Sequence, residues 1–404
     1  MKNKIISIIG LGYVGLPLLQ KLNKFYEVYG YDINIKKINI IKKKFKKLKV
    51  SNNVNIIKDS NIFIIAVPTP IYNNKKPNLN ILKNTTKQIS SYVKKNSLII
   101  YESTVYPGTT EEICVPIIEK ISKLILNKDF SVGYSPERIN PGDKKHNLEN
   151  TVKIISASNR KSLNILQVIY SKIVKAGVHK VSNIKTAESV KIIENVQRDI
   201  NIAIINEFSK IFNALNLNTN EIIKAASTKW NFINLKPGLV GGHCIGVDPY
   251  YLLHKSIKIG QKTYLIENAR KINESMTSYI FKNLKLITKT KNIDLKKASI
   301  LFLGATFKEN CDDIRNSKSL ELASHLLKKS KKITIIDPHF KNYKLRNLKI
   351  INKIPNIKYD ILLIAVAHKE FINNGFDYYL NYLKNKNIIF DLKNIFPGKS
   401  DFNL

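Results

Sequence analysis

Residues 5–32 decide the fold of the first part of the chain, and they read IISIIGLGYVGLPLLQKLNKFYEVYGYD. The apolar run at 5–9 predicts a short buried strand, and it leads into a G-x-G-x-x-G turn over 10–15. Apolar residues then recur at helical spacing. A second strand is predicted over 27–31, and Asp32 follows it, about 20 residues after the turn. The order strand, glycine turn, helix, strand and acid is typical of a dinucleotide-binding βαβ unit.

Each residue of this unit has a physical reason to be there. Gly10 permits the tight turn, and Gly12 lets the backbone approach a pyrophosphate whose charge meets the helix N-terminus. Gly15 allows close packing of helix on strand. Asp32 can accept hydrogen bonds from ribose hydroxyls and would repel a 2′-phosphate, so NAD is favoured over NADP as the cofactor. Lys37 is expected near the same ribose.

The rest of the chain alternates strands and helices around a helical middle section. Further strands are predicted over 62–67, 98–101, 130–134, 299–303, 333–336, 361–365 and 388–390. Helices are predicted over 185–215, 221–227 and 264–288. This pattern predicts the α/β class: two Rossmann-like parallel-sheet domains joined by a central helical domain with a long connecting helix. We expect an NAD-binding domain over 1–184, a central helical and dimerisation domain over 185–290, and a second Rossmann-like domain over 291–404.

Composition narrows the class of protein. Of 404 residues, 44% are apolar and 24% charged, which is globular composition. Three cysteines argue against a disulfide scaffold. No apolar run reaches the roughly 18 residues of a membrane span. The net charge of +37 is spread along the chain rather than gathered in one arm. We therefore expect a cytoplasmic protein without membrane insertion and without a nucleic-acid partner.

The loop over 241–249, GGHCIGVDP, places a thiol among glycines. Glycines let a backbone approach a substrate closely, which favours Cys244 as a nucleophile over a small core residue. A thiol with its ordinary pKa near ~8.5 needs a nearby cation or donor for that role. His243 is interpreted as structural, because neighbouring side chains usually diverge. No cysteine pair has C-x-x-C spacing, so no metal site is expected.

Taken together, the motifs resemble those of the UDP-glucose/GDP-mannose dehydrogenase family. The segments that carry the resemblance are GLGYVGLP (10–17), VPTP (67–70), YESTVYPGTTEE (101–112), GYSPERINPGDKKH (133–146), KIIENVQRDINIAIINE (191–207), KWNFINLKPGLVGGHCIGVDPYYLLHK (229–255) and FKENCDDIRNS (307–317). The sequences of residues 135–144 and 236–252 resemble those of the branch of this family that acts on UDP-N-acetylhexosamines.

The resemblance implies a four-electron oxidation of the sugar C6 alcohol to a carboxylate, with NAD as acceptor. The product would serve surface polysaccharide synthesis. The implied catalytic residues are Cys244 as nucleophile, Lys191 and Asn195 for the oxyanion, Glu137 as base for thioester hydrolysis, and Thr104 with Asp248 for the catalytic water. The implied cofactor residues are Gly10, Gly12, Tyr13, Val14, Gly15, Asp32, Lys37, Thr69, Thr104 and Arg315. The implied substrate residues are Glu137, Arg138, Lys191, Asn195, Gly241 and Lys308. The domain over 291–404 is the implied UDP-sugar domain.

The sequence alone leaves several points open. The segment between Asp32 and Ile62 is shorter than in this family and rich in lysine, which leaves one helix-and-strand unit unassigned. The sequence does not rank UDP-GlcNAc against UDP-GalNAc. A UDP-glucose 6-dehydrogenase and a basic binding protein that has lost catalysis are alternatives. The resemblance also implies a homodimer, with the helix over 185–215 buried on two sides.

Overall fold

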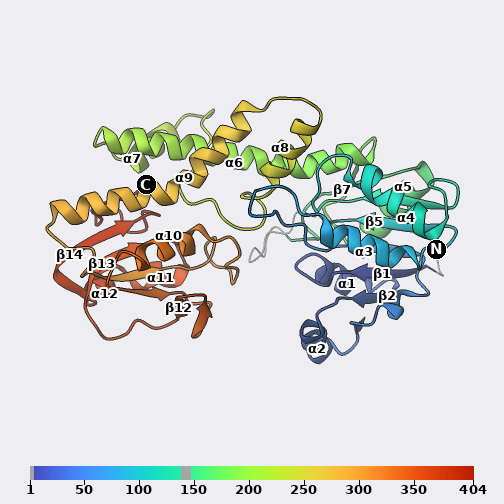
Figure 1. Cartoon of the computed structure of the whole chain (residues 1–404), viewed down its shortest axis with the longest axis horizontal. Coiled ribbons are helices and arrows are strands. Elements are labelled where there is room, and N and C mark those ends of the chain that lie inside the picture. Colours follow the sequence, from blue (N-terminus) through green and yellow to red (C-terminus); the bar gives the residue numbers. More distant parts are fainter. Residues whose placement is uncertain (1–3, 138–146) are drawn as a thin grey trace. The chain divides into compact units, whose positions relative to one another are not determined.

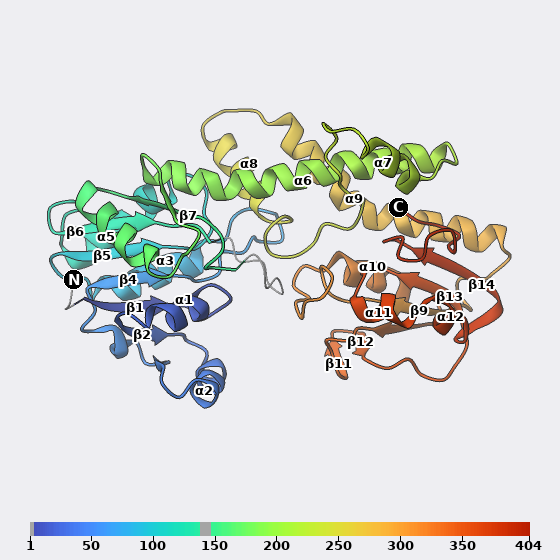
Figure 2. The same ribbon diagram turned by 180° about the vertical axis from the view of Figure 1, so that it is seen from behind.

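The computed structural model describes residues 4–137 and 147–404, and Figures 1 and 2 show it from opposite sides. The described chain separates into two compact units. The first comprises the chain up to Glu194 together with Tyr250–Lys262, and the second comprises Asn195–Pro249 and Thr263–Leu404. Each unit is built on its own mostly parallel sheet, so the predicted α/β class is confirmed. The three predicted domain boundaries stay a prediction.

The sheet of the first unit has the strand order β3-β2-β1-β4-β5-β6-β7-β8. Its strands are β1 (Ile5–Ile9), β2 (Glu27–Tyr31), β3 (Lys49–Ser51), β4 (Ile62–Ile65), β5 (Ser97–Tyr101), β6 (Phe130–Tyr134), β7 (Lys153–Ala157) and β8 (Val178–Lys180). Within this sheet, β6 and β7 pair antiparallel, and the other described strand pairs are parallel. The strand order reverses at β1, between β2 and β4. Ligands of open parallel sheets bind at such a reversal, beside the carboxyl ends of the strands.

Helices of the first unit share a core with these strands. They are α1 (Gly15–Leu22), α2 (Ile35–Lys44), α3 (Asn80–Ser90), α4 (Val115–Ser122) and α5 (Arg160–Ser171), with a 3₁₀ turn at Val54–Ile57 and a π-helical turn at Thr110–Cys114. Apolar side chains of α1, α2 and α5 pack in one cluster with Ile6, Ile64 and Ile100. The cluster fixes the carboxyl end of β1 against the start of α1, where the glycine turn lies.

The helix-and-strand unit that the sequence left unassigned is present. Asn34 caps α2 by accepting a hydrogen bond from the Lys37 N–H at 3.1 Å. Ile38 and Ile41 bury one face of the helix, and the short strand β3 then pairs with β2. The lysines of this segment stay exposed around that buried face. The shortening therefore leaves α2 and β3 in place.

The second unit has a six-stranded sheet in the order β11-β12-β10-β9-β13-β14. Its strands are β9 (Ser299–Leu303), β10 (Lys332–Ile336), β11 (Tyr343–Leu345), β12 (Leu348–Ile351), β13 (Tyr359–Ile364) and β14 (Leu383–Asp391). Within this second sheet, β11 and β12 pair antiparallel, and the other described strand pairs are parallel. Again the first strand, β9, marks the reversal of strand order. The second unit therefore repeats the topology that makes a ligand site at the carboxyl ends of the strands.

The remaining described helices are α6 (Ile184–Ala214), α7 (Thr219–Ala226), α8 (Asp248–Lys258), α9 (Tyr264–Thr290), α10 (Lys318–Leu327), α11 (Lys369–Asn374) and α12 (Phe376–Leu380). The periodicity predicted α6, α7 and α9. The start of α6, up to Glu194, and α8 from Tyr250 onward belong to the first unit. Side chains of α9 and α10 pack in one core cluster of the sheet, and side chains of α11 and α12 pack in another. None of the helices in the described ranges combines the length and hydropathy that a bilayer-spanning segment needs.

Candidate active site

The glycine turn has the geometry that the sequence predicted. Gly10 has a φ of +92°, and a Cβ there would lie 2.7 Å from the carbonyl oxygen of Ala66. A Cβ on Gly15 would overlap the carbonyl oxygen of Gly10. At Gly12, by contrast, nothing lies within 4 Å of the Cβ position. The fold itself therefore needs Gly10 and Gly15, whereas Gly12 leaves open space beside the backbone, where a pyrophosphate would approach.

Asp32 stands beside this turn at the end of β2. Its Oδ2 accepts a hydrogen bond from the Leu11 N–H at 2.9 Å, and its Oδ1 accepts one from the Asn34 N–H at 2.9 Å. The ammonium of Lys37 contacts Oδ2 at 2.7 Å. A carboxylate has about four acceptor positions, so ribose hydroxyls can still bind. The site fits NAD, although the positive charge of Lys37 offsets part of the repulsion toward a 2′-phosphate.

Two predicted cofactor residues meet at the ends of the next strands. Thr69 follows β4 and Thr104 follows β5, and the Thr69 hydroxyl donates to the Thr104 carbonyl oxygen at 2.6 Å. Tyr251 fixes the same segment by donating its hydroxyl to the Thr69 carbonyl oxygen at 2.8 Å. Tyr13 is 45% exposed, which leaves its ring accessible beside the turn.

Glu137 lies in a buried charged cluster that sequence reasoning missed. Its carboxylate is 2.9 Å from the Lys153 ammonium, which also contacts Glu102 at 2.6 Å, and Tyr170 donates its hydroxyl to Glu102. Burial raises the pKa of Glu102, against the opposing charge of Lys153. Burial would lower the pKa of Lys153, but the two carboxylates outweigh it and raise that pKa. Lys191 donates to the Glu137 carbonyl oxygen at 2.9 Å, so two predicted catalytic residues meet.

The thiol loop belongs to the second unit. Cys244 is half-buried, and its carbonyl oxygen accepts hydrogen bonds from the N–H groups of Val247 at 2.9 Å and Asp248 at 2.8 Å. The Asn195 amide donates to the Asp248 carboxylate at 2.5 Å, and both side chains are buried. Gly241 has no room for a side chain, because a Cβ would lie 2.6 Å from the Asn316 carbonyl oxygen. Two predicted catalytic side chains, those of Asn195 and Asp248, therefore contact each other, and the loop that carries Asp248 also carries Cys244 and Gly241.

The loop between β9 and α10 carries the remaining predicted residues. Arg315 donates to both carboxylate oxygens of Asp313, at distances between 2.6 and 3.1 Å, and its side chain is 50% exposed. Lys308 places its ammonium 5.9 Å from the centre of the Phe307 ring. Asp313 was not predicted as a site residue. Arg138 lies outside the described residues.

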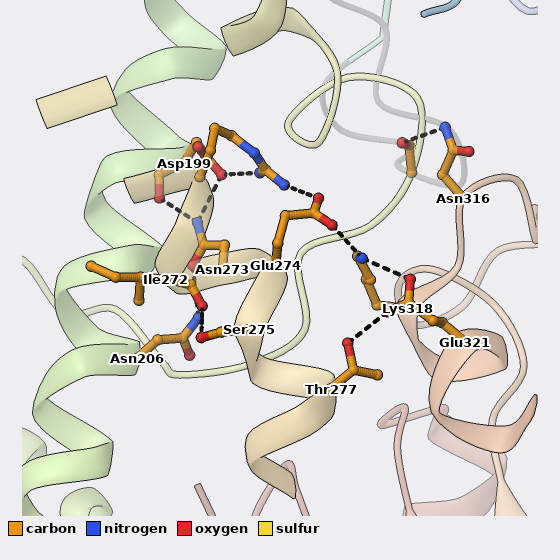
Figure 3. Close-up of polar contacts among 12 residues, drawn as sticks. Asp199, Asn206, Ile272, Asn273, Glu274, Ser275, Thr277, Asn316, Lys318 and Glu321 are labelled. Carbon is orange, nitrogen blue, oxygen red and sulfur yellow. Dashed lines mark hydrogen bonds and ion pairs between the residues drawn. The ribbon is translucent and has the colours of Figure 1, made fainter. Parts of the chain in front are cut away.

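A chain of ion pairs, buried at Asp199 and Arg270 and partly exposed at Glu274 and Glu321, links α6, α9 and α10 (Figure 3). Asp199 on α6 contacts Arg270 on α9 at 2.6 Å, and Arg270 also pairs with Glu274. Glu274 and Glu321 both contact the Lys318 ammonium, at 2.6 and 2.7 Å. Lys318 begins α10, and its backbone N–H lies beside Gly241. The network therefore ends next to the thiol loop. The sequence did not predict it, because charged residues at helical spacing indicate a helix face exposed to solvent.

One cluster of metal-type ligands lies elsewhere in the second unit. The ligand atoms of His339, His368 and Glu370 lie within 4.8 Å of one another. Both ring nitrogens of His368 are already engaged: Nδ1 accepts from the Asn310 N–H at 3.0 Å, and Nε2 lies 3.2 Å from the Asp337 carboxylate. A metal would have to displace these partners, so we propose no metal site here.

The chain is similar to known proteins along nearly its whole length. Models of the UDP-glucose/GDP-mannose dehydrogenase family match three consecutive segments: its NAD binding domain at residues 39–174, its central domain at 185–275 and its UDP binding domain at 301–398. The chain is 43% identical to UDP-N-acetyl-D-glucosamine 6-dehydrogenase of Salmonella typhi, over 98% of this chain and 97% of that one. It is 44% identical to Protein CapL of Staphylococcus aureus, with 97% and 96% covered.

A solved structure has the same fold over its full length. It is the UDP-D-ManNAc dehydrogenase of Pyrococcus horikoshii, with a TM-score of 0.88 at 31% identity, covering 99% of this chain and 98% of that one. The chain belongs to the UDP-glucose/GDP-mannose dehydrogenase family. It is a nucleotide-sugar dehydrogenase with an NAD binding domain and a UDP binding domain.

Proposed function

We propose that this chain oxidises the C6 alcohol of UDP-N-acetyl-D-glucosamine to the uronic acid in two NAD-dependent steps. The observation that carries the proposal is the thiol loop, in which Cys244 shares a turn with Asp248, and Asp248 binds Asn195. A relative at 43% identity is named for this substrate, whereas the solved UDP-D-ManNAc dehydrogenase is 31% identical. This difference favours UDP-GlcNAc over the mannose epimer.

NAD, held by the glycine turn and Asp32, supplies the hydride acceptor in both oxidations. The chain's own residues handle the carbonyl chemistry. The Cys244 sulfur bonds to C6 of the aldehyde, and the carbonyl π electrons move to oxygen. The Lys191 ammonium and the Asn195 amide stabilise the negative charge that develops there. Lys191 and Asn195 are four residues apart on α6, so their side chains leave the same face of that helix.

Hydrolysis of the thioester completes the reaction. Glu137 takes a proton from water, the water oxygen bonds to the acyl carbon, and the carbon–sulfur bond breaks with its electron pair on sulfur. Thr104 and Asp248 hold that water. The buried Lys153 supports this role because it fixes the Glu137 carboxylate while sharing its charge with Glu102. The product keeps its UDP group and is thus an activated sugar, suited to surface polysaccharide synthesis.

The proposal is tested by following the nicotinamide absorbance with a panel of UDP-sugars. We expect turnover with UDP-GlcNAc and two reduced cofactors per sugar consumed, with lower kcat/KM for UDP-GalNAc, UDP-ManNAc and UDP-glucose. A higher kcat/KM for UDP-glucose than for the other UDP-sugars would contradict the substrate assignment, because it would mean that the enzyme does not recognise the acetamido group.

We also propose a homodimer through α6. Apolar side chains at Ile204, Phe208 and Ile211 are 42%, 41% and 48% exposed, and their spacing places them on one face of the helix. Analytical ultracentrifugation should show a dimer that Phe208→Asp converts to a monomer. A strictly monomeric and active wild type would contradict the proposal.

A further inference from the structure

The ring of His243 is held between charged and aromatic neighbours. Its Nδ1 lies 3.5 Å from the Asp313 carboxylate and 3.3 Å from the Arg315 guanidinium. The ring meets Phe307 edge-on, with centres 5.9 Å apart and planes at 83°. Gly242 has a φ of +83°, so the backbone bends immediately before His243. The ring is therefore fixed by the loop between β9 and α10 rather than left to turn in solvent.

The side chains of His243 and Cys244, which are adjacent in the chain, also interact in the sense that favours a charged imidazole. The expectation that these neighbouring side chains diverge is wrong. The contact of the imidazole with Asp313 fixes the ring in the same loop that carries the thiol. The arrangement has three parts in order: a sulfur nucleophile, an imidazole beside it, and a carboxylate that orients the imidazole.

The charges around the imidazole favour its protonated form. The hydrogen bonds to Asp313 and Cys244 raise the pKa of His243 to about 9, while burial and the Arg315 charge oppose the rise. Burial alone would raise the pKa of Asp313, but hydrogen bonds from His243 and Arg315 hold it well below its usual range. Asp313 is therefore an anion at neutral pH, and Arg315 balances it. An imidazolium next to Cys244 would then be balanced by a thiolate.

We propose that His243 is a catalytic residue that holds Cys244 as a thiolate, with Asp313 as the positioning residue that orients its ring. The sulfur–hydrogen bond breaks, the proton moves to the ring nitrogen of His243, and the electron pair stays on sulfur. The thiolate is then ready to bond to the C6 aldehyde. This inference deepens the proposed function and rests on it for the identity of the electrophile, but the proton transfer itself needs no substrate.

The three cysteines make the thiolate measurable without substrate. Cys114 is buried, which raises its pKa to about 12, and burial also raises the pKa of Cys311. Of these thiols, only Cys244 is half-buried. Alkylation by iodoacetamide, followed by intact-mass spectrometry over a range of pH, therefore reports on Cys244. A Cys244→Ala variant gives the background rate.

In the wild type we expect the alkylation rate to reach half its plateau at least one pH unit below the ordinary thiol pKa of about 8.5. In His243→Gln the midpoint should move up to about that value, so that the rate at pH 7 falls at least about fivefold while the high-pH plateau changes less than twofold. Glutamine keeps hydrogen-bonding capacity but does not take up the proton. His325→Gln on the exposed end of α10 is the matched control and should leave the profile unchanged.

Asp313→Asn provides a second variant if His243→Gln fails to fold. It keeps the imidazole but removes its anion, so the midpoint should rise to a value between those of the wild type and His243→Gln. Superimposable profiles for the wild type and the folded variant would overturn the proposal. Failure to oxidise any UDP-sugar would contradict the proposed function but would leave the alkylation profile as evidence on His243, so the two failures are distinguishable.

Discussion

The two Rossmann-like units make the same turn from different sequences. In the first, Gly10 has a φ of +92° and donates its N–H to the Tyr31 carbonyl oxygen at 2.8 Å. In the second, Gly304 has a φ of +95° and donates its N–H to the Ile336 carbonyl oxygen at 2.8 Å. In both, a glycine ends the first strand and bonds to the end of the next.

The acid after the second strand is also shared. The Asp32 carboxylate accepts the Leu11 N–H at 2.9 Å, and the Asp337 carboxylate accepts the Ala305 N–H at 2.8 Å. Their surroundings differ, however. Asp32 is paired with Lys37, whose side chain is 40% exposed. Asp337 is fully buried beneath His368, which is also fully buried. The Asp32 side chain is itself 7% exposed, so the contrast lies in the partner: a half-exposed lysine beside the first carboxylate and a fully buried imidazole beside the second.

The chain after each glycine differs too. The first turn enters α1 at Gly15, so backbone N–H groups line it. The second turn leads into a long loop before α10 starts at Lys318, and that loop carries Lys308, Asp313 and Arg315. One βαβ geometry can therefore bind a cofactor through its backbone or present side chains on a loop, and the length of chain between the glycine and the next helix decides between the two.

The largest expected effect breaks the first turn itself. Gly15→Ala should destabilise the first unit by more than about 3 kcal/mol, because its Cβ would overlap backbone at Gly10. Gly12→Ala is the matched control, since its Cβ meets nothing within 4 Å. It should keep the wild-type Tm but weaken NAD binding at least about tenfold. Thermal unfolding and calorimetric titration with NAD measure both, and equal loss of Tm in the two variants would contradict the distinction.

A double-mutant cycle on each acid sharpens the comparison. We expect a coupling energy of about 2–3 kcal/mol between Asp337 and His368, because removing either leaves a buried polar partner. The coupling between Asp32 and Lys37 should stay below about 1 kcal/mol, because the lysine is exposed to solvent. Denaturant unfolding of Asp337→Asn, His368→Ala and their combination gives the first value, and the corresponding Asp32 and Lys37 variants give the second. Equal couplings would mean that burial does not separate the two turns.

We expect Asp32, but not Asp337, to determine the preference for NAD over NADP. Asp32→Ala should reduce the preference for NAD over NADP by about tenfold or more, because both ribose hydrogen bonds and charge repulsion are lost. Asp337→Ala should leave that preference unchanged. The ratio of kcat/KM values for NAD and NADP is the measurement. A wild type that uses NADP as well as NAD would contradict the role of Asp32.

The smallest effect is a pH dependence specific to Asp337. Burial alone would raise the pKa of this acid, but the hydrogen bond and charge of His368 lower it below its ordinary value. A lowered folded-state pKa adds stability above the unfolded-state pKa of about 3.9, and that stability is lost as the pH falls through the folded-state pKa. Asp337→Asn should therefore show a shallower loss of stability below pH 4 than the wild type. Parallel acid-unfolding curves would argue against this.

Much of this architecture was predictable from local sequence. The strands β1, β2 and β9 and the helix α6 were predicted to within a residue or two, because long apolar periodicity and glycine turns fix them. Short edge strands such as β3, β8 and β11 were not predicted, because three residues carry too little periodicity. Asp32 was found from its spacing to the glycines, whereas Asp337 was not, because no glycine fingerprint precedes it.

The buried polar residues were the part of the structure that could not be predicted from the sequence. Lys153 and Lys318 are buried, yet in a chain with 67 lysines and arginines each resembles one more surface cation. Each has one partner far away in sequence, Glu102 for Lys153 and Glu274 for Lys318, and only the folded chain brings these pairs together. His243 was interpreted as structural because neighbouring side chains usually diverge. The carboxylate that its ring contacts, that of Asp313, lies 70 positions further along the chain and could not be inferred from the sequence.

The central claim is that Cys244 carries the acyl group, and Cys244→Ser tests it most directly. An alkoxide leaves less readily than a thiolate, so an acyl group passed to serine should hydrolyse slowly. With NAD and UDP-GlcNAc we predict loss of steady-state turnover, retained binding of both ligands, and an acyl ester on residue 244 in the mass spectrum. Turnover within about tenfold of the wild type, a change of only ~1.4 kcal/mol in the barrier, would show that Cys244 is not the nucleophile.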